Sequence, residues 1–98
     1  MGFRLSREAV EDISHIIEQG MILFGQVQAE RYYDELFAIF DLLAANPHMA
    51  RARFELSPPL RVHPHKAHLI FYRIENDDHI LILGVRHEHE DWQREYRH

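Results

Sequence analysis

The chain has 98 residues, 46% of them hydrophobic, and a formal net charge of −5 at pH 7. This length favours one domain with one core, which we place at residues 1–98. The absence of cysteine excludes disulfides, thiolate metal sites and a cysteine nucleophile, and is compatible with a reducing cytosol.

No stretch of the sequence approaches the ~18 to 20 apolar residues of a membrane span, and residues 1–20 carry charges among their apolar positions, unlike an export signal. We therefore expect a cytoplasmic protein that does not contact a membrane.

The excess acid lies in the first half of the chain. Residues 1–46 hold three Lys or Arg and eight Asp or Glu, whereas residues 47–98 hold eight of each. One segment of the second half is basic, with five cations and three histidines against Glu55 alone: Arg51, Arg53, Arg61, Lys66, Arg73, His63, His65 and His68. Such a segment can meet an acidic partner or phosphates, and arginines spread over a loop and a strand explain the charge equally well.

A first helix is expected after a short extended piece at residues 2–5. Ser6 is a good N-cap, and Gly25 is a natural stop. Apolar residues recur between them at spacings of three or four and form one stripe: Val10, Ile13, Ile17, Met21 and Phe24. Gly20 weakens this helix and allows a bend or an early end there.

A second helix is predicted from Gln26, ending where Asn46 precedes Pro47 and disfavours further helix. Its stripe is widened by other aromatic residues and contains Ala29, Tyr33, Leu36, Phe40 and Leu43. Two helices of similar length joined by about one glycine form an antiparallel hairpin.

The second half predicts an antiparallel meander. Residues 48–59 are expected to be a loop, followed by strands rich in β-branched and aromatic residues at 60–63, 67–74 and 79–87. Residues 75–78 read as a turn because Asn and Asp tolerate left-handed backbone. The fold class is therefore α+β: an N-terminal antiparallel two-helix hairpin packed on a small, mainly antiparallel β-sheet.

Alternation along the strands makes both faces of the sheet apolar. Leu69, Phe71, Leu81, Leu83 and Val85 share one face. The other carries His68, Ile70, Tyr72, Ile80 and Ile82. One helical hairpin covers only one face of a sheet, and an exposed apolar face usually marks a binding site.

We expect the face of Ile70, Tyr72, Ile80 and Ile82 to be the uncovered one, where a partner segment would gain about 6 to 12 kcal/mol gross. On this view Ile82→Asp weakens partner binding more than tenfold and leaves the monomer folded. In the alternative, the C-terminal tail with Trp92 and Tyr96 folds back over the face.

The sequence contains residue types suited to two kinds of chemistry. The pairs His63/His65 and His87/His89 could chelate zinc or nickel, but no third ligand is fixed by spacing and surface histidine is the default. Acid/base cleavage of RNA would need residues of the types of Arg61, Lys66, His87 and Tyr96, each of which also has a structural explanation. No glycine-rich phosphate loop, Ser-His-Asp signature or HExxH is present, so we expect no enzyme, metal or cofactor.

Three blocks in order resemble the ParE branch of the RelE/ParE superfamily, over essentially the whole chain. AERYYDELFAIFDLLAANPHMAR ends a helix at Asn46-Pro47 before a basic loop. The next block matches at Arg61, His68 and IFYR (70–73), and GVRHEHEDW matches at Val85, His87, Asp91 and Trp92. Gly84 and Arg86 depart from the family's arginine and leucine, and we expect Gly84 on the face of Ile80 and Ile82.

The resemblance implies the toxin of a type II toxin–antitoxin system that inhibits DNA gyrase by binding. It also implies neutralisation by a ParD-like, ribbon-helix-helix antitoxin, through which alone the toxin would meet operator DNA. The rivals are a RelE-like, ribosome-dependent mRNA endonuclease, against which the acidic composition weighs, and a non-toxic interaction module. We expect antitoxin contacts at Arg61, His68, Ile70, Tyr72, Ile80 and Ile82, and target contacts at Arg86, His87, Asp91 and Trp92.

Overall fold

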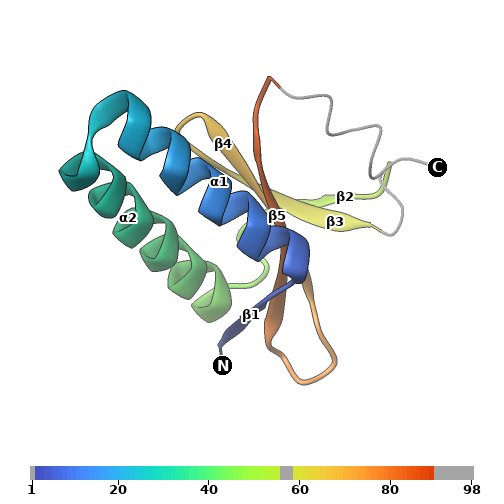
Figure 1. The fold of residues 1–98 in the computed structure, drawn as a ribbon. Helices are drawn as coiled ribbons and strands as arrows, with labels where there is room; N and C mark the ends of the chain where they lie inside the picture. Colours follow the sequence, from blue (N-terminus) through green and yellow to red (C-terminus); the bar gives the residue numbers. More distant parts are fainter. Residues whose placement is uncertain (1, 56–58, 90–98) are drawn as a thin grey trace.

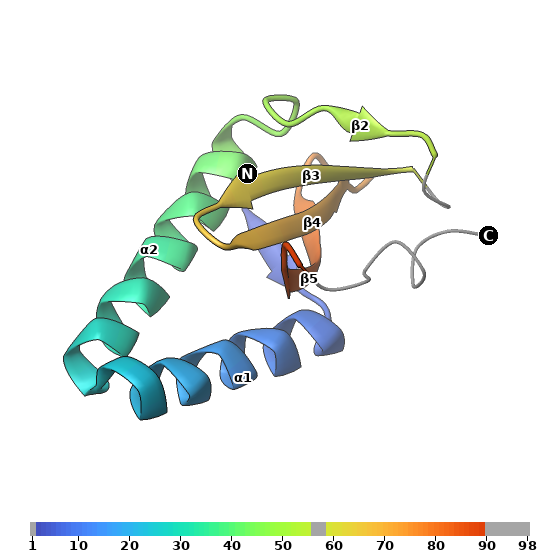
Figure 2. The same ribbon diagram turned by 90° about the horizontal axis from the view of Figure 1, so that it is seen from above.

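The computed structural model describes residues 2–55 and 59–89 and arranges them as two helices on one face of a five-stranded sheet (Figures 1 and 2). The elements in chain order are β1 (Phe3–Leu5), α1 (Arg7–Phe24), α2 (Gln26–Ala45), β2 (Ala52–Arg53), β3 (Leu60–His65), β4 (His68–Ile74) and β5 (Ile80–His87). The strand order is β1-β5-β4-β3-β2. β1 runs parallel to β5 and every other pair is antiparallel, so the predicted fold class is confirmed.

Both helices begin and end where the sequence predicts. The Ser6 hydroxyl accepts a hydrogen bond from the backbone N–H of Ala9 and donates one to the carbonyl of Leu83, so the cap also fixes α1 to β5. Gly25 joins the helices at φ 89°, a left-handed conformation that favours glycine. Gly20 causes no early end; a Cβ there would lie 3.5 Å from the Cβ of Ala29, at a close approach of the two helices.

The apolar stripe of α1 is only partly buried. Ala9 and Ile13 are in the core, whereas Val10, Met21 and Phe24 from the predicted stripe are exposed, as is Tyr33 of α2. For Met21 and Phe24 the reason is geometric: the end of α1 that meets Gly25 extends beyond the sheet (Figure 2), so that no strand of the described residues lies beneath it.

One strand was missed by the sequence. β2 lies inside the predicted loop and pairs Ala52 with Arg61 and Arg53 with Leu60. Two residues show no alternation, which is why the pattern could not reveal them. The turn over residues 75–78 is confirmed, with Asp78 at φ 66°.

The prediction of the uncovered face is wrong. Ile70, Tyr72, Ile80 and Ile82 are 0% exposed and form the main core with buried residues of both helices, among them Ile13, Leu36, Phe40 and Leu43. The sequence showed two apolar faces but did not indicate which one the helices cover. These four side chains therefore hold the helices onto the sheet.

A β-bulge changes the faces of β5. Phe71 pairs with Gly84 but Tyr72 pairs with Ile82, so Leu83 is an extra residue in this strand. Val85 consequently joins the core under the helices, and Gly84 stands opposite Phe71 on the other face. The predicted sides of Gly84 and Val85 are both reversed, and the carboxylate of Asp12 on α1 accepts the N–H of Val85 (3.0 Å) just beyond the bulge.

The helix-free face carries a smaller apolar cluster. Leu60 and Phe71 are buried at its centre, and Val62, Leu69 and Leu83 pack around them partly exposed. The alternative that Trp92 and Tyr96 cover an apolar face concerns a tail that lies outside the described residues.

Candidate functional site

A groove of about 1010 Å³ opens between the two helices and the turn that joins β3 to β4. The helices meet at Gly25 and diverge toward the sheet, which leaves this space between them (Figure 2). Its apolar lining consists of Ile16, Ile17, Leu23, Phe24, Ala29 and Val85. Its polar lining includes Asp12, Tyr32, Glu35, Lys66, His68, Arg86 and His87. An apolar groove with a few converging polar groups is the usual form of a binding site.

Tyr32 and His68 form the centre of the polar lining. The Tyr32 hydroxyl lies 2.7 Å from Nδ1 of His68, and the ring of His65 stacks on Tyr32 with centroids 5.6 Å apart. Burial, and secondarily the charge of Glu35, raises the pKa of Tyr32 to about 12. The Tyr32 phenol therefore stays protonated at neutral pH and shares its hydrogen bond with Nδ1 of His68.

An ion pair fixes the β3–β4 turn to α2. Nζ of Lys66 donates to Oε1 of Glu35 at 2.6 Å, and Nε2 of His65 lies 3.6 Å from the same oxygen. The hydrogen bond from Lys66 is the main reason that the pKa of the Glu35 carboxyl lies below its usual range. Lys66 also lies 5.6 Å from the centroid of the Tyr32 ring. These contacts hold the polar wall of the groove in place.

Histidines from neighbouring strands extend this wall. His68 pairs with His87 across β4 and β5, and their rings meet edge to face with centroids 5.6 Å apart. In the part of the chain that the structure describes, no three His, Cys, Asp or Glu residues are grouped as a metal ion would require. The pairs His63/His65 and His87/His89, for which local spacing indicated no third ligand, have none grouped with them among residues 2–55 and 59–89.

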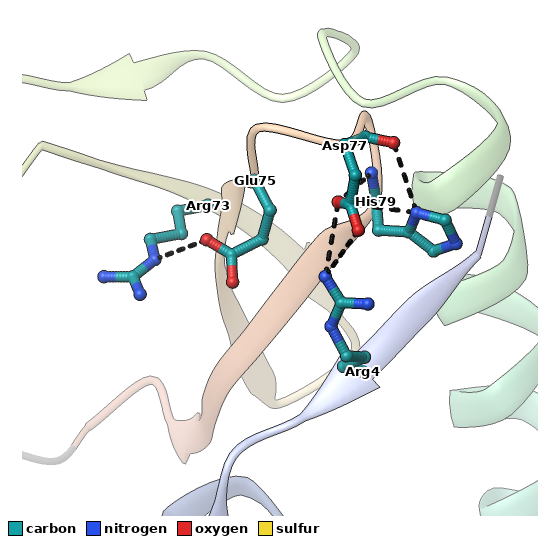
Figure 3. A network of polar contacts seen from close by, with 5 residues as sticks. All are labelled: Arg4, Arg73, Glu75, Asp77 and His79. Atoms are coloured by element: carbon teal, nitrogen blue, oxygen red, sulfur yellow. Dashed lines mark hydrogen bonds and ion pairs between the residues drawn. The ribbon is translucent and has the colours of Figure 1, made fainter.

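On the helix-free face, three arginines have carboxylate partners. Arg73 donates to Glu75 at 3.2 Å, and Arg4 donates to Asp77 at 3.0 Å (Figure 3). The bond from Arg4 is the largest of the effects that lower the pKa of Asp77. At the β2 edge of the sheet, Nε of Arg53 lies 2.7 Å from Oε2 of Glu55.

The residues expected from the sequence to contact the antitoxin and the target are not grouped into those two sites within the part of the chain that the structure describes. Of the expected antitoxin contacts, His68 lines the groove, whereas Arg61 donates to the carbonyl of Ala50 (2.6 Å) and secures the loop after α2. Ile70, Tyr72, Ile80 and Ile82 are core, as described above. Of the expected target contacts, Arg86 and His87 line the same groove as His68, and Asp91 and Trp92 lie outside the described residues.

Sequence reasoning missed the groove itself, including Ile16, Gln28 and Glu35. These residues come from two helices and face a turn in the second half of the chain. The exposed part of the α1 stripe was the available signal, because apolar residues beyond the sheet need another neighbour. Of the four residues considered for RNA chemistry, Lys66 and His87 line the groove, Arg61 does not, and Tyr96 lies outside the described residues.

No helix in residues 2–55 or 59–89 is long and apolar enough to cross a membrane.

Comparison with known proteins gives three findings. The family model for the ParE toxin of type II toxin–antitoxin systems (parDE) matches residues 3–92. The Toxin ParE1 sequences from two strains of Mycobacterium tuberculosis are 37% identical to this chain over 71 residues, covering 72% of each chain. A structure from the chromosomal ParDE TA system of P. aeruginosa superposes with a TM-score of 0.76 at 18% identity, covering 89% of this chain and 95% of that one, and shares the fold.

Proposed function

Because this chain belongs to the ParE family, the toxins of type II toxin–antitoxin systems, we propose that it inhibits DNA gyrase by binding and that a ParD-like antitoxin neutralises it. The toxin itself carries out no chemistry in this proposal. In this proposal the protein acts in the cytoplasm, where both partners are found. The toxin meets operator DNA only through the ribbon-helix-helix part of the antitoxin.

The observation that carries the proposal of a protein partner is the groove between α1 and α2. Leu23 and Phe24 are largely exposed along it, and burying both would contribute about 3 to 6 kcal/mol gross, before the costs of association. A segment of the antitoxin with apolar side chains at helical spacing fits a groove with two helical walls.

The charges of the groove favour an acidic residue in this segment. Its two carboxylates are already engaged within the chain, Asp12 with the N–H of Val85 and Glu35 with Lys66. Against these two carboxylates the groove has three cations: Arg31, Arg86 and Lys66, the last of which is the partner of Glu35. A carboxylate of the partner placed near the mouth would meet more positive than negative charge.

Two features support inhibition by binding over cleavage of RNA. Cleavage on the ribosome requires cations that are available to phosphates, and Arg4, Arg53 and Arg73 on the helix-free face each have a carboxylate partner. The chain also has a net charge of −5, which opposes binding to phosphates.

The target is tested by incubating the purified chain with gyrase and supercoiled plasmid, and in parallel with programmed ribosomes. Linear DNA that gyrase leaves unsealed is the expected result. Cleaved message in the ribosome reaction would replace the proposal with the endonuclease, and no effect in either reaction would point to a non-toxic interaction module.

The antitoxin site is tested by filling the groove with a bulky side chain. Gln28 is exposed and lines the groove, so Gln28→Trp leaves the core intact and is expected to weaken binding of the antitoxin encoded beside this gene more than tenfold. Gln26→Trp is the matched control, because Gln26 lies on the same helix without lining the groove and should change affinity less than twofold. Equal affinities for the two variants would exclude the groove.

A further inference from the structure

The tip of the helical hairpin is strongly apolar and lies in water. Met21, Ile22, Leu23, Phe24 and Val27 are 45%, 76%, 66%, 69% and 71% exposed. We call these five residues the tip patch. Figures 1 and 2 show that the tip, where α1 passes into α2, projects beyond the sheet, so no strand of residues 2–55 and 59–89 covers it.

The patch is large for the surface of a monomer. Its residues expose together roughly 600 Å², the upper end of what the largest apolar patch on a soluble monomer reaches, and such patches are often functional. The structure explains the other exposed apolar residues more simply, since Val10, Leu42 and Phe54 are distant from one another along the chain.

The charge around the tip indicates what kind of surface can cover it. Residues 19–29, QGMILFGQVQA, contain no charged side chain, although the whole chain carries −5. Two copies of an acidic chain repel each other at most orientations, but contact through this segment brings no like charges together. Nothing lies within 4 Å of the position where a Cβ of Gly25 would stand, so the backbone there is open to close approach.

We propose that the tip patch binds the tip patch of a second copy of this chain, in a two-fold symmetric dimer of the free toxin. Complete burial of both patches would remove at most about 1,200 Å² from water, so the interface is small and the dimer is weak. An isologous contact of this kind closes on itself and makes a dimer without growing into a fibre. An interface of this size and composition is consistent with a dissociation constant in the micromolar range.

The patch also overlaps the groove, because Leu23 and Phe24 belong to both. A segment seated in the groove would cover part of the surface that the second copy needs. The dimer is therefore expected to give way when the antitoxin binds, a consequence that rests on the proposed function, whereas the dimer itself does not.

Sedimentation of the purified full chain over a hundredfold concentration range tests the dimer. The mass is expected to rise from 11.8 kDa toward twice that value. Replacing both Ile22 and Val27 by Glu places carboxylates against each other across the two-fold axis and should weaken the dimer at least tenfold. Phe54→Glu is the matched control, because Phe54 is as exposed as Ile22 (78% against 76%) and lies after β2, away from the tip.

A chain that stays monomeric at every concentration would overturn the proposal, as would a double variant that dimerises as tightly as the wild type. Circular dichroism is expected to show that the variants remain folded, because the side chains of Ile22 and Val27 are already in water. The chain has no cysteine, so Ile22→Cys gives a single thiol whose oxidation should link two copies far faster than Phe54→Cys.

The same disulfide separates the dimer from the proposed function. Saturating antitoxin is expected to suppress the link at Ile22→Cys. Unchanged linking with the antitoxin demonstrably bound would overturn the overlap of the two surfaces, whereas failure of the antitoxin to bind at all would count against the proposed function and leave the dimer standing.

Discussion

The burial of Ile82 contradicts the expectation that its face of the sheet is exposed. Its side chain is 0% exposed beneath the helices, beside Ile80 and Tyr72. Replacing a buried isoleucine by alanine costs about 2 to 5 kcal/mol, from the lost burial and the cavity that remains. Against a total stability of about 5 to 15 kcal/mol, Ile82→Ala should lower the melting temperature by at least about 8 °C.

The assay is a thermal melt followed by circular dichroism at submicromolar concentration, where the proposed dimer is dissociated, with Ile22→Ala as the control. Both substitutions remove the same atoms, but Ile22 is 76% exposed, so its replacement should change stability by no more than about 0.5 kcal/mol. Ile82→Asp places a carboxylate in the core and should leave the chain unfolded at room temperature. A folded Ile82→Asp protein, or equal melting temperatures for the two alanine variants, would refute the assignment of the core face.

Two further predictions concern single polar contacts. Tyr72→Phe removes the hydrogen bond that its hydroxyl donates to the carbonyl of Pro47 (2.7 Å) and should cost about 1 kcal/mol, measured by urea unfolding; no loss would mean that the bond does not secure the loop after α2. Arg4→Gln removes the main cause of the lowered pKa of Asp77. A lowered folded pKa stabilises the protein above the ordinary value of 3.8 and ceases to do so as the pH falls through the folded value. This variant should therefore be less stable than the wild type at neutral pH and equal to it once the pH is below the lowered pKa of Asp77. Equal stability at both pH values would show that the exposed pair contributes nothing.

The sequence predicted the elements well because their ends have local causes. Ser6, Gly25 and the Asn46-Pro47 step each act on the backbone within a few residues, and the structure starts or stops a helix at each. The faces of the sheet have no such local cause. Which of two apolar faces the helices cover depends on packing between segments far apart in the sequence, and the hydrophobic pattern is the same for either choice.

The bulge at Leu83 shows why the end of β5 was misplaced. Alternation counted from Ile80 puts Gly84 beneath the helices, but one inserted residue reverses every later side chain. The groove could not be predicted for a related reason, since its walls come from α1, α2, β5 and the β3–β4 turn. The sequence nominated His68, Arg86 and His87 among its residues as binding positions, matched Val85 to a motif and considered Lys66 for RNA cleavage, in no case through geometry.

The parallel pairing of β1 with β5 joins two segments that are far apart in the sequence. Phe3 pairs with Ile80, so β1 has no neighbour in the sheet until β5 has formed. Contacts of such sequence separation form late and slowly in folding. A chain without β5 therefore lacks both the partner of β1 and the wall that Val85 and His87 supply to the groove.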